Sequence, residues 1–358
     1  MENLGLSGAT FYMIARQTII EDNNATGSSI IAGGNGLNFA QHIYFSRNDI
    51  RNVRGNDREV MTYDAEGAQY AGAPLTINAT HVTTPNCPGR MDSRFRDTNN
   101  YNSAPEGGVI AILDGPGAGL HRRIVEWGAT GAPINYDSKP CWWRIDQPFP
   151  SALTSRTNLS AVTLVVTFFA GRSVFASNTF SDTGHFQLYH SGIDNVVTGH
   201  TLARTGGMWI GGMSVAMRHY LNNSAGPLQP NPTLRNEFFD NTVSVGHRAP
   251  HACDPRNMTR ESFWACGAGQ HQMFSFGMDG QGGSMAEGLF ANRFQAFNRN
   301  TISGANGILM WGLGNADALV AGNSFYNVEI KVGIDQFPVG VDTVVNYVLY
   351  NNSDRVLE

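Results

Sequence analysis

Histidine, arginine and aspartate side chains follow short apolar runs in the second half of the chain. Histidine can take up or release a proton near neutral pH, and arginine can neutralise the carboxylate of a uronic acid. A polysaccharide lyase needs both groups, because it abstracts the proton next to a neutralised carboxylate. The candidates for catalysis are therefore His247, Arg248, His271 and Asp279, and those for substrate binding are His190, Arg218 and His219. An ordinary hydrogen bond in a loop is the alternative role for each of them.

Three carboxylates and an arginine lie within eight residues nearer the start of the chain, at Asp57, Arg58, Glu59 and Asp64. Hydrolysis of a glycosidic bond uses one protonated and one ionised carboxyl group. We therefore expect catalytic roles for Glu59 and Asp64 and substrate binding by Arg58, in a loop between two strands. The same carboxylates could bind Ca²⁺, which is the one cofactor that the sequence suggests. A salt-bridged loop is the alternative.

Aromatic residues lie in or beside the same apolar runs, at Tyr189, Trp209, Phe274, Phe276 and Trp311. Alternate residues of a strand point to opposite faces, so an outward Trp would stack on a sugar ring and an inward one would belong to the core. We assign Trp209 and Trp311 to substrate binding and expect Phe274 and Phe276 in the core. His247, His251 and His271 lack the spacing of a zinc site, and the sequence identifies no metal.

A short pattern recurs along the chain, in which apolar residues precede an asparagine and another apolar residue stands two positions after it. Copies occur around Asn48, Asn178, Asn236, Asn292, Asn300 and Asn323, and a variant copy has His200 in place of asparagine. The spacing is 22 residues from Asn178 to His200 and 23 residues from Asn300 to Asn323. Such a period is the length of one coil in a solenoid.

Short runs of β-forming residues follow the copies of this pattern. They are FQLYH (186–190), GMWIGG (207–212), TVSVGH (242–247), QMFSFGM (272–278), GILMWG (307–312) and VEIKVG (328–333). Short strands repeated once per coil predict an all-β protein, a parallel β-helix in which stacked coils share a core. Asparagine tolerates a left-handed turn, and its amides can form a hydrogen-bonded ladder from coil to coil. A β-sandwich or a propeller is the alternative, which the scarcity of Asn-Gly and Asp-Gly turns disfavours.

One stretch lacks the repeat. Residues 109–113 and 123–127 alternate between apolar and polar types on either side of a glycine-rich segment, 115–119, which predicts two antiparallel strands. We therefore expect early coils in residues 1–82, an inserted antiparallel β-subdomain in 83–160, and the main coils with a C-terminal tail in 161–358. The glycine-rich segment lacks the Lys-Ser/Thr ending of a phosphate-binding loop.

Composition restricts the classes of protein to consider. The chain has 358 residues, of which 41 are Gly and 33 are Asn, a balance that disfavours long helices. Its net charge of −5 and its scattered basic residues indicate no nucleic-acid partner. The longest apolar run, 161–170, is too short to span a membrane. The sequence indicates no oligomeric state.

Cysteines and glycosylation motifs favour a secreted glycoprotein. Cys253 and Cys266 bracket a polar loop and suggest one disulfide, which leaves Cys87 and Cys141 for a second, although other pairings remain open. Six N-x-S/T motifs lie at Asn24, Asn78, Asn158, Asn222, Asn257 and Asn351. No signal peptide is recognisable in residues 1–8, which fits a mature or trimmed chain or a fragment of a longer protein.

The coil pattern resembles the right-handed parallel β-helix superfamily, which has the pectin-lyase-like fold, over most of the chain outside the inserted stretch. Residues 56–72 (NDREVMTYDAEGAQYAG) and 114–125 (DGPGAGLHRRIV) also resemble stretches of uncharacterised secreted β-helix proteins. The superfamily implies a polysaccharide lyase or hydrolase, or a tailspike or adhesin. The polygalacturonase and pectate lyase motifs are missing, and HRAPH (247–251) lacks the second arginine of the latter.

Two functions follow from these observations. The first is a secreted lyase or glycoside hydrolase that acts on a polysaccharide bound along an outer groove of the coils. The second is a non-catalytic β-helix that binds glycans or belongs to an extracellular assembly, which the missing family motifs favour. Incubation with acidic glycans separates them, because only a lyase produces unsaturated uronates.

Overall fold

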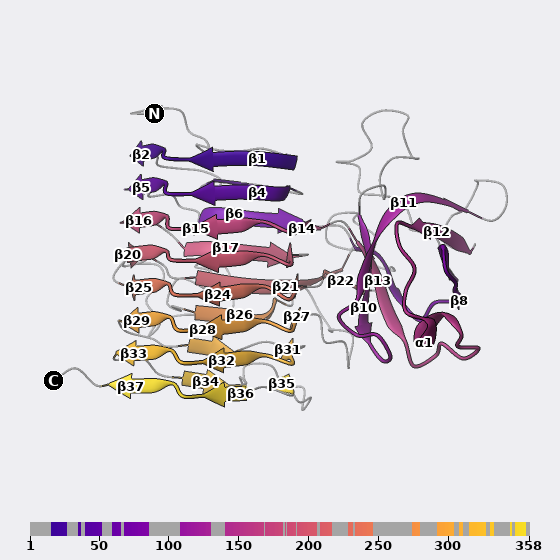
Figure 1. The fold of residues 1–358 in the computed structure, drawn as a ribbon. Helices are drawn as coiled ribbons and strands as arrows, with labels where there is room; N and C mark the ends of the chain where they lie inside the picture. The colour runs from indigo at the N-terminus through magenta and orange to yellow at the C-terminus, as the bar shows by residue number, and fades with distance from the viewer. Residues whose placement is uncertain are drawn as a thin grey trace.

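The computed structural model shows an all-β protein made of a stack of parallel strands and a separate antiparallel sheet (Figure 1). It describes residues 16–26, 35–36, 40–51, 59–65, 68–85, 108–129, 140–167, 169–181, 183, 185–190, 192–205, 208–216, 228–231, 233–245, 274–279, 292–303, 308–310, 315–326, 330–332, 344–345 and 348–355. Within these ranges the one α-helix is the single turn α1 (Ser151–Thr154).

The longest sheet has fourteen strands and is called here the bent sheet. In the first two coils one strand spans the bend, in β1 (Arg16–Glu21) and β4 (Gln41–Ser46). Later coils begin with a two-residue strand, in β14 (Ala170–Gly171), β18 (Gly192–Ile193), β23 (Thr233–Leu234), β27 (Asn292–Arg293), β31 (Asn315–Ala316) and β35 (Val344–Val345). A three-residue strand follows the bend, in β15 (Val174–Ala176), β19 (Val196–Thr198), β24 (Glu237–Phe239), β28 (Ala296–Asn298), β32 (Leu319–Ala321) and β36 (Val348–Tyr350).

Two further parallel sheets complete each coil. The β2 sheet consists of β2 (Asn24–Thr26), β5 (Asp49–Arg51), β16 (Thr179–Ser181), β20 (Thr201–Thr205), β25 (Thr242–Val245), β29 (Thr301–Ser303), β33 (Ser324–Tyr326) and β37 (Ser353–Arg355). The β3 sheet consists of β3 (Asn35–Gly36), β6 (Glu59–Ala65), β17 (His185–His190), β21 (Met208–Ala216), β26 (Phe274–Asp279), β30 (Ile308–Met310) and β34 (Ile330–Val332), with β22 (Leu228–Asn231) antiparallel to β21. Within the described residues the chain visits the bent sheet and the β2 sheet eight times and the β3 sheet seven times, always in this order, and each strand pairs with its counterpart one coil away.

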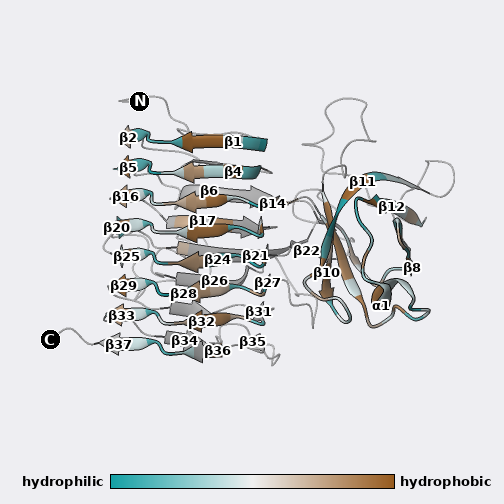
Figure 2. Ribbon diagram, in the orientation of Figure 1, coloured by the Kyte–Doolittle hydropathy of each residue, from teal (hydrophilic) through white to brown (hydrophobic). Residues whose placement is uncertain are grey.

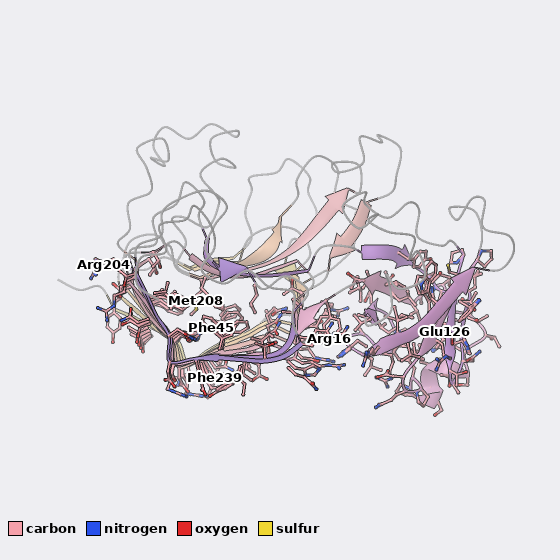
Figure 3. The ribbon with its side chains drawn as sticks, turned by 90° about the horizontal axis from the view of Figure 1, so that it is seen from above. Arg16, Phe45, Glu126, Arg204, Met208 and Phe239 are labelled. Carbon is pink, nitrogen blue, oxygen red and sulfur yellow. The ribbon has the colours of Figure 1, made fainter. Side chains whose placement is uncertain are left out.

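The core of the stack lies between these sheets. In the three-residue strands whose burial the structure describes, the middle residue is buried and its neighbours are more exposed, as in β16, where Phe180 lies between Thr179 and Ser181. Phe45 and Phe175 occupy the same register position in consecutive coils, with ring centroids 6.1 Å apart. Seen from above, Phe45 and Met208 point into the space enclosed by the coils (Figure 3). Hydrophobic strand centres stack on one another while the turns are hydrophilic (Figure 2).

Both turns that flank the three-residue strands have a left-handed residue. Between the halves of the bent sheet, at the first corner, positive φ angles occur at Gln17, His42, Arg172, Asp194, Arg235, Phe294 and Asp317. Between the bent sheet and the β2 sheet, at the second corner, they occur at Asp22, Arg47, Ser177, Gly199, Asp240, Arg299, Gly322 and Asn351. At most of these turns the next residue is a buried polar one, such as Asn195 or Asn241, whose side chain bonds to neighbouring coils.

Asparagine ladders connect the coils at these corners, as the repeat predicts. At the second corner the ladder runs through Asn23, Asn48, Asn178, His200, Asn241, Asn300, Asn323 and Asn352. In a typical rung, the backbone N–H and the side-chain amide of Asn241 both donate to Oδ1 of Asn300, at 3.0 and 2.9 Å. The first corner has a shorter ladder through Ser173, Asn195, Asn236 and Gln295.

The antiparallel sheet is inserted between the second and third coils. Its strands are β7 (Ala68–Gly72), β8 (Thr76–Ile77), β9 (His81–Thr84), β10 (Val109–Asp114), β11 (His121–Ala129), β12 (Cys141–Ile145) and β13 (Thr163–Thr167). The predicted hairpin is confirmed, because β10 pairs with β11 around Gly115, Gly117 and Gly119, all at positive φ. The sheet reaches from 68 to 167, wider than the expected 83–160, because Tyr70 pairs with Val166 across β7 and β13.

Candidate functional site

The predicted site residues map to the β3 sheet and to the connections that enter or leave it. Glu59 and Asp64 lie on β6, His190 ends β17, Trp209 lies on β21 and Asp279 ends β26. The other predicted site residues lie outside the described residues: Arg58, Arg218, His219, His247, Arg248, His271 and Trp311. In the sequence, Arg58 directly precedes β6, Arg218 and His219 follow β21, and Trp311 follows β30, so all four adjoin strands of one sheet.

Strand register brings several of these positions together. Tyr189 pairs with Asp64 on one side and with Gly211 on the other, and His190 pairs with Ala65. Asp279 pairs with Met213, two residues beyond Gly211. Adjacent strands are about 4.8 Å apart, so Asp64, His190 and Asp279 belong to one edge of the sheet that is four strands wide. Residues separated by more than 200 positions in sequence thereby become neighbours.

The aromatic positions follow the alternation of the strands. Gln187 pairs with Trp209, and Trp209 pairs with Ser275. These positions alternate with a row in which Phe186 and Met208 are both buried. Phe274 pairs with Met208 and therefore has the same register position as that row. Trp209 therefore occupies the row that alternates with the core.

Two expectations about the site are wrong. Glu59 and Asp64 are not in a loop but within strand β6. Five residues of extended chain separate them, or about 16 Å, whereas the two carboxyl groups of a glycosidase are about 5 to 10 Å apart.

The run 242–247 was expected to be equivalent to the runs of the β3 sheet, but β25 pairs with β20 and β29 in the β2 sheet. His247 and Arg248 therefore belong to the long connection from β25 to β26.

Cysteine chemistry is described for one of the four residues. Cys141 begins β12, is fully buried and is disulfide-bonded. Cys87, Cys253 and Cys266 lie outside the described residues, so the pairing of Cys87 with Cys141 and of Cys253 with Cys266 stays a prediction.

A second polar cluster lies where the antiparallel sheet contacts the first corner. Nη2 of Arg235 is 2.7 Å from Nδ1 of His121, and Nη2 of Arg172 is 3.0 Å from its Nε2. Arg235 also donates to both carboxylate oxygens of Asp194, at 2.7 and 2.9 Å, and to the backbone oxygen of Gly119. Burial lowers the pKa of His121 to about 4; Asp194 opposes this shift, and Arg235 and Arg172 add to it. His121 is therefore neutral near pH 7 and serves to hold the two parts together.

Apolar contacts complete this junction. Val109, Leu113 and Val165 of the antiparallel sheet form one buried cluster with Ile193 and Leu234 of the coils. Gly119 has a positive φ, and a Cβ there would lie 2.7 Å from the ring of Phe294. Phe294 thus packs against the inserted sheet, and not inside the coils as the Asn292 copy of the repeat suggested.

Sequence reasoning missed the chemistry of His200. Its Nδ1 accepts the backbone N–H of Asn178 at 2.9 Å, so the neutral ring carries its proton on Nε2. Nε2 is buried with no hydrogen-bond partner within the described residues, and the ring packs against Phe180 and Phe186. Burial lowers the pKa of His200 to about 3. The variant copy of the repeat was the signal that could have singled it out.

The described residues contain no group of three or more His, Cys, Asp or Glu that could hold a metal ion. Nor do they contain a helix long and apolar enough to cross a membrane. The Ca²⁺ expected beside Asp57, Glu59 and Asp64 remains a prediction, since Asp57 lies outside these ranges.

Comparison with known proteins gives matches among solved structures but no family. No protein-family model matches the chain, and no curated protein matches it either. A solved structure that matches is the crystal structure of the Pseudomonas phage phi297 tailspike gp61, with 9% sequence identity and a TM-score of 0.27. The match covers 93% of this chain, and the chain spans 64% of the length of the tailspike. At this identity and TM-score the match assigns no activity to the chain.

Proposed function

We propose that the stacked coils form a right-handed parallel β-helix and that its β3 sheet binds a polysaccharide, which the protein cleaves by β-elimination. The observation that carries this proposal is the register of the β3 sheet, which places Asp64, Trp209 and Asp279 in the rows that alternate with the core, whereas His190 ends β17 in the row of the buried Leu188. A sugar chain is long and flexible, and a sheet several coils wide offers it a row of successive contacts. Trp, His and Asp supply stacking, proton transfer and hydrogen bonds to hydroxyl groups.

Elimination fits these residues better than hydrolysis does. Glu59 and Asp64 are about 16 Å apart along β6, which is too far for the pair of carboxyl groups that a glycosidase uses. Histidine and arginine candidates adjoin the sheet instead, and a lyase needs a base and a cation for the uronate. The connection from β25 to β26 supplies His247, Arg248 and His271. We propose His271 or His247 as the base, Arg248 as the neutralising cation, and Arg58, Arg218, His219 and Trp311 as further binding residues.

A secreted location accompanies this proposal. A disulfide at Cys141 is typical of proteins from an oxidising compartment, and extracellular polysaccharides are encountered there. A non-catalytic glycan-binding protein is the second candidate, and the hydrogen-bonded ladders of the described corners favour it as a rigid scaffold.

The test is incubation of the purified protein with alginate, pectin, ulvan and glycosaminoglycans while the absorbance of unsaturated uronates is followed. We expect one of these glycans to produce a rise, and His271→Ala or His247→Ala to slow it at least about 100-fold, because a general base contributes about that factor or more. Thr242→Ala on the exposed β2 sheet is the control and should keep the wild-type rate.

Three results decide between the candidates. No rise with any glycan, together with retarded migration in glycan-containing gels, supports the non-catalytic protein and overturns the lyase. New reducing ends without unsaturated uronates would indicate hydrolysis. Neither cleavage nor binding of any glycan would contradict the proposal as a whole.

A further inference from the structure

Four basic residues gather where the antiparallel sheet meets the first three coils. Arg16 begins β1, His42 lies in β4, Arg172 follows β14, and Arg123 comes from β11 of the antiparallel sheet. Gln41 pairs with both Arg16 and Gly171, so His42 and Arg172 occupy the first corner in consecutive coils, about 4.8 Å apart along the stack. Figure 3 shows Arg16 on the side of the coils that faces the antiparallel sheet.

Electrostatics indicate that these four groups are close to one another. The pKa of His42 is lowered by partial burial first and then by the positive charges of Arg172, Arg16 and Arg123. No carboxylate contributes to this shift. Three guanidinium groups from two coils and the inserted sheet thus repel a fourth positive charge at His42, and an anion placed among them would relieve that repulsion.

In the described part of the chain, the carboxylates form ion pairs with other arginines. The ion pairs found there engage other arginines, at Arg47, Arg51, Arg144, Arg235, Arg293 and Arg299, and none of them involves Arg16, Arg123 or Arg172. Two carboxylates of this region have partners of their own. Asp194 is bound by Arg235, and Asp146 accepts the backbone N–H of Arg123 at 3.0 Å.

The cluster is both anchored and accessible. The guanidinium of Arg172 lies over the ring of Phe169, with 5.6 Å from its guanidinium carbon to the ring centroid, and its Nη2 is 3.0 Å from Nε2 of His121. Arg16, His42 and Arg123 are exposed. One guanidinium is therefore fixed while two others remain free to close on a ligand from opposite sides of the junction.

We propose that Arg16, His42, Arg123 and Arg172 form an anion-binding site that takes the carboxylate or sulfate groups of an acidic polysaccharide. Guanidinium groups bind both anions through paired hydrogen bonds, and an exposed site admits a polymer without needing a closed pocket. The site rests on the proposed function for the identity of its ligand, and it narrows the substrate to uronate-rich or sulfated glycans. It exists only when the antiparallel sheet is docked on the coils, which gives the insertion a role in recognition.

The experiment compares two double variants that lose the same charge. Arg16→Gln with Arg123→Gln removes two cations that have no ion pair within the described residues, and Arg144→Gln with Arg299→Gln removes two that Glu126 and Asp240 already neutralise. Binding to alginate and heparin is measured by calorimetry at 50 mM salt. We expect the first variant to bind at least about tenfold more weakly than the wild type and the second to stay within about twofold. Replacement of Arg16 and Arg123 by lysine should retain most of the affinity.

Salt and ligand controls separate this site from the proposed function. The tenfold difference should shrink in 0.5 M salt, because exposed charges are then screened beyond about 4 Å. Equal binding by the wild type and the first variant would overturn the site and leave the proposed function standing. If the wild type binds no glycan, the proposed function fails and sulfate tests the site alone. The site is supported if sulfate raises the unfolding temperature of the wild type and the second variant but not of the first variant. An equal rise in the wild type and both variants overturns it.

Discussion

Replacing Asn241 by alanine should lower the free energy of unfolding by about 3 kcal/mol or more. In the second-corner ladder Oδ1 of Asn241 accepts the backbone N–H of His200 at 2.9 Å. Its side-chain amide donates to the backbone oxygen of Val197 and to Oδ1 of Asn300. Each of these buried bonds contributes about 1 kcal/mol, and a partner left without a bond costs about 1 to 3 kcal/mol. Chemical denaturation followed by circular dichroism measures the loss.

Thr242→Ala is the matched control for this variant, because it removes a similar number of atoms from the next residue. Thr242 is exposed on the β2 sheet, and its replacement should change stability by about 0.5 kcal/mol at most. Similar losses in the two variants would show that the ladder contributes no more than an exposed threonine does.

Replacing His200 by asparagine should make the protein less sensitive to acid. The pKa of His200 is about 3 in the folded protein, because of burial, and about 6.5 when the chain is unfolded. Below pH 6.5 the unfolded chain therefore binds a proton that the folded protein excludes. Stability falls by roughly 1.4 kcal/mol per pH unit as the pH drops toward 3, or about 3 kcal/mol between pH 6.5 and pH 4. Asparagine fits the ladder and does not titrate.

Denaturation curves at pH 7 and at pH 4 test this prediction. We expect the His200→Asn variant to resemble the wild type at pH 7 and to be more stable by about 3 kcal/mol at pH 4. Some acid sensitivity should remain in the variant, because the pKa of the buried His121 is also lowered. Parallel loss of stability in both proteins between pH 7 and pH 4 would rule out His200 as the source.

The sequence predicts the stacking but not every rung of the ladders. Asn48, Asn178, Asn300 and Asn323 lie in clear copies of the repeat, and all four are in the second-corner ladder. Asn241 was missed because Asn236, five residues earlier, matched the pattern first, and that residue belongs to the other corner. The first-corner ladder uses Ser173 and Gln295 as well as asparagine, so its members share a position and a bonding role but no residue type.

The sequence also predicts only some positions of the candidate site. The positions of His190, Trp209 and Asp279 follow from short β-forming runs that the sequence shows. The charged residues around β6 favoured a loop, whereas the alternation of Met61 and Tyr63 with Thr62 and Asp64 is typical of the strand that forms there. The cluster of Arg16, His42, Arg123 and Arg172 has no local signal at all. Its members come from three coils and an insertion, and only the docking of the two parts brings them together.

The most direct test of this account is a crystal structure of the protein with an acidic oligosaccharide bound. The account predicts sugar rings along the β3 sheet, in contact with Asp64 of β6 and Trp209 of β21 and crossing β17 between them. A sugar bound only to the exposed β2 sheet, or only to the face of the antiparallel sheet away from the coils, would contradict it.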